Sequence, residues 1–145
     1  MGQLHPSFIV GIGGSAGALN AYKAFLDALP STTGMAFVIG SQIHPTANSQ
    51  LVHILSRHTK MPVTLASTAM PIRANHAYVI PPNAGLLIEN YTFKVATPRT
   101  GRDEQIDLLF SSLADAMGTR AIGIILSGYG GDGTEIGRAS CRKRV

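Results

Sequence analysis

Apolar residues along this chain recur in two alternating patterns. Short runs with almost no polar residue are typical of strands buried on both faces of a sheet, and they cover residues 7–12, 35–40, 63–66 and 121–126. Apolar residues spaced three and four apart are typical of helices with one buried side, and they cover residues 19–29, 48–57 and 103–117. This alternation predicts a parallel sheet with helices on both of its faces.

The middle of the chain departs from this alternation. Short runs at residues 77–80, 85–89 and 92–96 have a strand-like composition and are separated by the turn-forming segments 81–83 and 89–90. They predict a hairpin or meander inserted into an α/β domain. The expected fold class is therefore a three-layer α/β/α domain with a mainly parallel sheet and an inserted β-hairpin, similar in its layers to Rossmann folds.

The composition is that of a folded domain without a membrane segment. Hydrophobic residues make up 45% of the 145 residues and charged residues 14%, a balance unlike that of disordered chains. No apolar run approaches the roughly 20 residues that a membrane-spanning helix needs, so we expect no membrane insertion. The single cysteine, Cys141, fits a reducing compartment, and we expect a cytoplasmic protein.

The net charge of +4 is concentrated at one end of the sequence. Four of the twelve basic residues lie in residues 136–145, and without this segment the chain has eight basic and eight acidic residues. The body of the chain thus has no basic face for a phosphate backbone, and we expect no nucleic-acid partner. Residues 136–145 also lack apolar periodicity, so we interpret them as a basic tail after a domain at residues 1–135.

Three loops follow the carboxyl ends of predicted strands, where α/β domains usually bind their ligands. They lie at residues 13–15, 41–45 and 128–133. The sequence GGSAG at residues 13–17 fits the pattern G-x-S-x-G at a strand-to-helix junction. Such a sharp turn exposes the serine hydroxyl, and the first amides of the helix can stabilise an oxyanion. The same residues also fit a plain glycine-rich turn in which Ser15 caps the helix.

A dinucleotide-binding turn is the rival interpretation of the first loop. Gly11, Gly13 and Ala16 fit a relaxed fingerprint that needs an acidic residue about 20 positions further on, to bind the ribose. No acidic residue lies between Asp27 and Glu89. We therefore expect no nucleotide cofactor, and the spacing of the histidines predicts no metal site.

A nucleophilic serine needs a base, and the base needs an orienting group. His44 lies in the second of the three loops and Asp132 in the third. Because the carboxyl ends of parallel strands meet at one edge of a sheet, Ser15, His44 and Asp132 are candidates for a catalytic triad. Simpler interpretations remain, since Asp132 precedes a glycine as in common turns and His44 precedes Pro45 in a loop.

Five blocks of the sequence occur in a characteristic order and approximate spacing. They are GGSAG at residues 13–17, the His-Pro pair at 44–45, YVIPP at 78–82, IDLLF at 106–110 and LSGYGGDGT at 126–134. Together they resemble the catalytic domain of CheB-type methylesterases, in a variant similar to versions fused to a CheR-type methyltransferase. The resemblance implies hydrolysis of glutamate γ-methyl esters, with glutamine deamidation, on methyl-accepting chemoreceptor-type proteins during chemotaxis adaptation.

The resemblance also implies roles for single residues. Ser15 is then the nucleophile, Asp132 orients the base, and the amides of Ala16 and Gly130 are candidates for an oxyanion hole. Neither a metal nor an organic cofactor is implied, and phosphorelay control is expected to come from outside this chain. The family continues beyond the third loop with further helices and strands, whereas residues 137–145 do not match. The domain is therefore expected to be incomplete at its C-terminal side.

The loop after the second strand departs from the family's pattern. The family's histidine directly follows a glutamine, but a gapless alignment on Pro45 and Ser49 puts Gln42 at that position instead of His44. Two extended residues move a side chain by up to ~7 Å, and a general base must come within about 2.6–3.2 Å of its proton. Either His44 folds back onto Ser15, or the chain is a catalytically degenerate module that binds signalling partners.

Overall fold

The computed structural model describes residues 5–14, 19–40, 48–81, 84–96 and 102–126. Its helices are α1 (Leu19–Ala28), α2 (Asn48–Leu55) and α3 (Arg102–Met117), and the 3-10 turns η3 (Ser56–His58) and η4 (Gly118–Arg120) follow α2 and α3. Its strands are β1 (Ile9–Gly14), β2 (Ala36–Ile39), β3 (Val63–Leu65), β4 (Ala77–Val79), β5 (Gly85–Glu89), β6 (Thr92–Ala96) and β7 (Ala121–Leu126).

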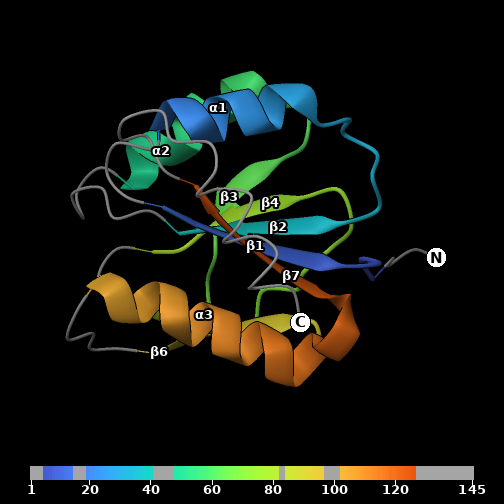
Figure 1. Cartoon of the computed structure of the whole chain (residues 1–145), viewed down its shortest axis with the longest axis vertical. Helices are drawn as coiled ribbons and strands as arrows, with labels where there is room; N and C mark the ends of the chain where they lie inside the picture. Colours follow the sequence, from blue (N-terminus) through green and yellow to red (C-terminus); the bar gives the residue numbers. More distant parts are fainter. Residues whose placement is uncertain (1–4, 15–18, 41–47, 82–83, 97–101, 127–145) are drawn as a thin grey trace.

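The main sheet has the strand order β3-β4-β2-β1-β7, and every neighbouring pair in it is parallel (Figure 1). Strands β5 and β6 form a separate antiparallel pair. A mainly parallel sheet with an inserted hairpin is the fold class that the sequence predicts, and it is confirmed.

One sequence-based grouping needs correction. We expected residues 77–80 to belong with the inserted hairpin or meander, but β4 lies inside the main sheet between β3 and β2. All its residues are buried, and it pairs with a strand on each edge. A central parallel strand needs only a short apolar run, which by composition alone looks like a hairpin strand. The insertion is therefore the β5–β6 hairpin alone.

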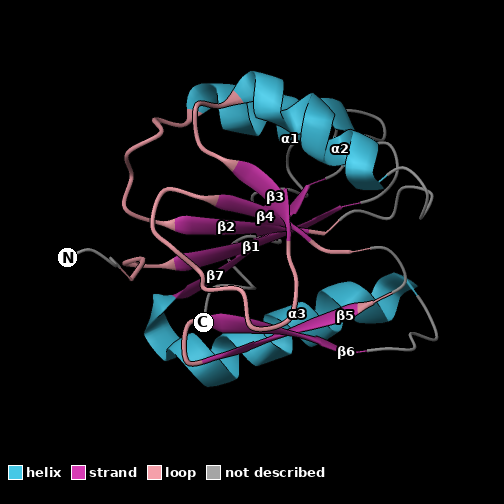
Figure 2. Ribbon diagram, turned by 180° about the vertical axis from the view of Figure 1, so that it is seen from behind, coloured by secondary structure: helices cyan, strands magenta, loops and turns pink. Residues whose placement is uncertain are grey.

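The sheet is covered on both faces. Helices α1 and α2 lie on one face, and α3 with the β5–β6 hairpin lies on the other (Figure 2). Alternate residues of each strand point to opposite faces, so Val10 and Ile12 of β1 join the core under α1 and α2, whereas Ile9 joins the core beside α3. The strands are thus apolar on both sides, which explains their continuous apolar runs.

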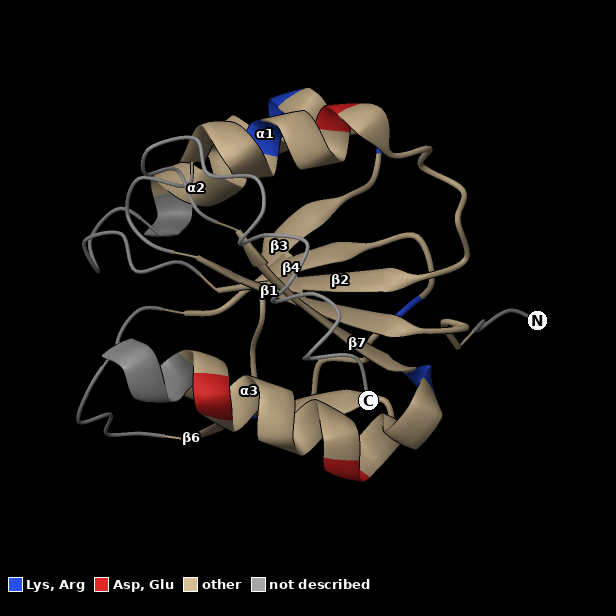
Figure 3. Cartoon of the chain, in the orientation of Figure 1, with Lys and Arg blue, Asp and Glu red and all other residues tan. Residues whose placement is uncertain are grey.

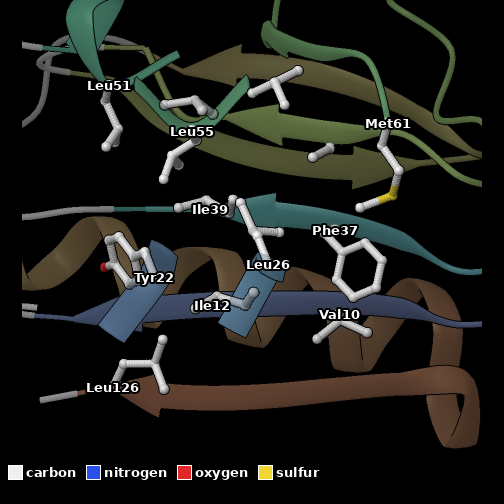
Figure 4. Close-up of a cluster of buried hydrophobic side chains, with 13 residues drawn as sticks. Val10, Ile12, Tyr22, Leu26, Phe37, Ile39, Leu51, Leu55, Met61 and Leu126 are labelled. Carbon is white, nitrogen blue, oxygen red and sulfur yellow. The ribbon is translucent and has the colours of Figure 1, made fainter. Parts of the chain in front are cut away.

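The core between the sheet and the helices α1 and α2 is drawn in Figure 4. Tyr22 and Leu26 of α1 and Leu51 and Leu55 of α2 are at most 2% exposed. Burying side chains of this size stabilises the fold by roughly 1.5–3 kcal/mol each. This apolar stripe confirms the helix that the sequence predicts at residues 19–29.

Hydroxyl groups form hydrogen bonds in the core on the other face of the sheet, beside α3 and the β5–β6 hairpin. Ser112 of α3 accepts a hydrogen bond of 2.7 Å from the amide of Ile88, which attaches the helix to β5. The Tyr78 hydroxyl accepts a hydrogen bond from the Arg73 amide at 2.9 Å and donates one to the Pro71 carbonyl at 3.2 Å. Burial raises the pKa of Tyr78 above its ordinary value.

The described part of the chain contains the helices named above. Each of them is too short or too polar to cross a bilayer.

Candidate functional site

The carboxyl ends of β1, β2 and β7 lie side by side. Strand β1 is in the middle, and its last residue Gly14 is opposite Leu126, the last residue of β7. On its other side, the amide of Gly40 donates a hydrogen bond of 2.7 Å to the carbonyl of Ile12. The three loops that the sequence singles out therefore begin at neighbouring points on one edge of the sheet, as expected for a ligand site of an α/β domain.

Glycines allow α3 to approach this edge closely. A Cβ atom added at Gly13 would lie 2.8 Å from Cγ2 of Ile106, and one added at Gly40 would lie 2.7 Å from Cδ1 of Ile106. Real Cβ contacts essentially never reach that distance. Ile106, which is 8% exposed, thus packs on the ends of β1 and β2 together. A Cβ at either position would force the Ile106 side chain or its surroundings to shift.

This packing predicts the effect of a methyl group at Gly13. We expect Gly13→Ala to lower the free energy of unfolding by about 1–3 kcal/mol, because overpacking a close-packed core has an effect of that size. Urea unfolding followed by circular dichroism measures it.

A double variant provides the control for this prediction. In Gly13→Ala combined with Ile106→Ala, the clash is relieved, so the loss should be smaller than the sum of the single losses by at least about 1 kcal/mol. Simple additivity would contradict the inferred contact between Gly13 and Ile106.

The other face of the sheet contributes a polar contact to the same edge. The hydroxyl of Tyr22, on α1, donates a hydrogen bond of 2.8 Å to the carbonyl of Gly40. Sequence reasoning assigns Tyr22 to the buried side of the helix but does not identify this bond. Its only sequence signal is a phenol at a core position, since a buried tyrosine hydroxyl usually requires a polar partner.

The predicted site residues themselves lie outside the described residues. This holds for Ser15, for Gln42 and His44, for Asp132, and for the oxyanion candidates Ala16 and Gly130. The described strands bring together the points at which their loops begin. The proximity of the side chains therefore stays a prediction.

Histidines elsewhere in the described part make local contacts. Nδ1 of His58 lies 2.9 Å from a carboxylate oxygen of Asp27, and Nδ1 of His76 lies 2.8 Å from the carbonyl of Ala74. His53 on α2 is exposed. Among the described residues, no group of three or more His, Cys, Asp or Glu side chains could hold a metal ion.

Charged residues of the described part do not gather into a basic face. In Figure 3, Lys and Arg positions are scattered among Asp and Glu positions on the helices and loops. The described part of the chain therefore carries charges of both signs without a continuous basic stripe.

Known proteins are similar in sequence to this chain. The family model described as CheB methylesterase matches residues 10–140. A protein-glutamate methylesterase/protein-glutamine glutaminase of Hydrogenovibrio crunogenus is 30% identical over 133 residues, which cover 88% of this chain and 35% of that protein. A protein of Leptospira interrogans is 32% identical over 127 residues, which cover 86% of this chain and 66% of that protein. The chain thus spans less than two thirds of the length of these relatives.

A solved structure shares the fold. The catalytic domain of the Thermotoga maritima CheB methylesterase superposes with a TM-score of 0.73, covering 94% of this chain and 76% of that one at 20% sequence identity. At this identity the likeness concerns the fold alone. It agrees with the layered sheet described above and with the fold class predicted from the sequence.

Proposed function

This chain belongs to the CheB methylesterase family, and from that membership we propose that it hydrolyses glutamate γ-methyl esters on chemoreceptor-type signalling proteins. Glutamine deamidation at the same site is part of the proposal, because one relative is named for both reactions. The observation that carries it is the side-by-side arrangement of the carboxyl ends of β1, β2 and β7. From these ends begin the loops that contain a serine, a histidine and an aspartate.

The proposed chemistry is acyl transfer in two steps. The hydroxyl of Ser15 attacks the ester carbonyl and gives its proton to His44, which Asp132 orients. The histidine returns the proton to the leaving methoxide, so that methanol departs and an acyl-serine remains. Water, deprotonated by the same histidine, then releases the glutamate carboxylate and regenerates the serine.

Charge stabilisation completes this scheme. In each tetrahedral intermediate the former carbonyl oxygen carries a negative charge, which hydrogen-bond donors must stabilise. The backbone amides of Ala16 and Gly130 are the proposed donors, since one directly follows the nucleophile and the other lies in the loop of Asp132. For glutamine the sequence of steps is the same, with ammonia leaving in place of methanol.

The proposed reaction indicates the partners of this chain, and its cysteine content indicates the location. The substrate is the methylated segment of a chemoreceptor-type protein, so the chain acts in chemotaxis adaptation. A fused or associated methyltransferase, which makes the esters that this chain removes, and phosphorelay control by a receiver domain belong to the same proposal. A cytoplasmic location fits Cys141 as a single cysteine, since reducing compartments keep thiols free.

A second candidate function is a binding module without catalysis. It is favoured by one observation, that a gapless alignment puts Gln42 where the family has its histidine. An amide cannot accept the serine proton, so a chain using Gln42 at that position would bind receptor or partner without hydrolysing esters.

Methanol release tests the proposed reaction. We expect the 145-residue chain to release methanol from a receptor methylated at glutamates faster than buffer alone, with the matching glutamates demethylated in mass spectra of its peptides. The unmethylated receptor is the control and should yield no methanol. A rate equal to spontaneous hydrolysis would contradict the esterase proposal and favour the binding module.

A further inference from the structure

Gly40, at the carboxyl end of β2, contacts the neighbouring strand and side chains on both faces of the sheet. Its amide donates to the carbonyl of Ile12, at 2.7 Å, and its carbonyl accepts from the hydroxyl of Tyr22, at 2.8 Å. On the opposite face of the sheet, side-chain atoms of Ile106 and Ile80 lie 2.7 Å from the position that a Cβ of Gly40 would occupy. The neighbouring strand, α1 and α3 therefore all fix this one residue.

Tyr22 is well suited to this contact. It is 2% exposed in the core beneath α1, and Figure 4 shows its ring among the apolar side chains, with its oxygen at the ring's far end. The hydrogen bond joins residues 18 positions apart. A leucine or phenylalanine would fill the same apolar space without reaching the carbonyl. The hydroxyl therefore adds a hydrogen bond that packing of the core does not by itself require.

We propose that Tyr22 is a positioning residue for the esterase reaction: its hydroxyl fixes the carboxyl end of β2, from which the segment with Gln42 and His44 continues. This inference rests on the proposed function. Gln42 is two residues beyond Gly40 and His44 is four. Over so short a distance, a shift of the strand end is passed on to the start of the loop. A displacement of about 1 Å in a catalytic group can lower the rate about 100-fold.

The test compares two variants that each remove one buried hydroxyl. Tyr22→Phe deletes the bond to Gly40, and Tyr78→Phe deletes the bonds of the Tyr78 hydroxyl to Pro71 and Arg73 in the opposite core. Both variants keep the aromatic ring. We expect Tyr22→Phe to lower kcat for methanol release about 10- to 100-fold with KM changed less than about threefold, because substrate contacts are retained. Tyr78→Phe should leave both constants near those of the unmodified chain.

Amide hydrogen exchange reports the anchoring without depending on activity. In Tyr22→Phe, the Gly40 amide should exchange about tenfold faster relative to amides at the centre of β1, because one local restraint is lost. In Tyr78→Phe this ratio should be unchanged. The β1 reference removes any general loss of stability from the comparison.

The outcomes distinguish the positioning role from the proposed function. Unchanged exchange at Gly40 in Tyr22→Phe would overturn the positioning role, whatever the activity. Equal falls in kcat for the two variants would overturn it too, since the effect would then be general destabilisation. If the unmodified chain and Ser15→Ala release methanol equally slowly, the proposed function fails, and the exchange at Gly40 alone supports or overturns the anchoring of the strand end.

Discussion

Replacing Ser15 by alanine is expected to lower the rate of methanol release by about 10³- to 10⁶-fold, to near the spontaneous rate. The serine hydroxyl is the proposed nucleophile, and alanine has no atom that could form the acyl intermediate. Binding and oxyanion stabilisation are all that would remain to assist hydrolysis. Ser15 directly follows Gly14, the last residue of β1. Its removal is therefore the most severe single change that the proposed site allows.

A second serine, at the other end of β1, provides the matched control. Ser7 precedes the amino end of β1, is exposed, and donates a hydrogen bond of 3.2 Å to the carbonyl of Gly34. Ser7→Ala should retain the full rate, with thermal unfolding recorded for both variants. If Ser15→Ala keeps more than about a tenth of the rate, the nucleophile is not Ser15, because loss of a triad member has a far larger effect.

Replacing His44 by alanine is expected to have the next largest effect. If His44 is the base, His44→Ala should lower kcat about 10³-fold or more, whereas Gln42→Ala should change it less than about tenfold. The physical reason is that imidazole exchanges protons near neutral pH and an amide does not. Steady-state methanol release for the two variants measures the difference. His53→Ala, at an exposed position on α2, is the control and should be unaffected.

The opposite pattern would identify the degenerate binding module. A chain that is inactive before and after His44→Ala, but gains methanol release on Gln42→His, would show that the family's histidine position is Gln42. That outcome would contradict His44 as the base. It would leave Ser15 and Asp132 as residues of a site that lacks only its proton acceptor.

The sequence alone gives most of the secondary structure correctly. The helix predicted at residues 19–29 is α1. The sequence predicts four inward positions on α3: Ile106, Leu109 and Leu113 are at most 8% exposed, whereas Phe110 is only partly buried. These predictions succeed because burial on one side of a helix imposes its period directly on the sequence. The segment predicted at residues 48–57 corresponds to α2 and the 3-10 turn η3, a change of hydrogen bonding that apolar spacing does not encode.

The first strand shows where local reasoning fails. A strand was predicted to end at residue 12, with Gly13 and Gly14 in a turn, but β1 continues through both glycines and pairs with Ile125 and Leu126 of β7. Glycine has a low strand propensity, so sequence patterns favour a turn. The strand continues because the ladder to β7 and the close approach of Ile106 make glycine the residue that fits.

What the sequence by itself determined is the layered α/β class and the family, and it named the candidate residues for ester hydrolysis. These follow from periodic burial and from motifs whose spacing is visible along the chain. The tertiary structure alone decided that β4 enters the main sheet, that β1 lies between β2 and β7, and that Tyr22 and Ile106 meet at Gly40 from opposite faces. Those facts depend on contacts between residues far apart in sequence. The spacing of apolar residues along the chain does not indicate which distant side chain packs beside a glycine, or which carbonyl accepts the hydrogen bond of a buried phenol.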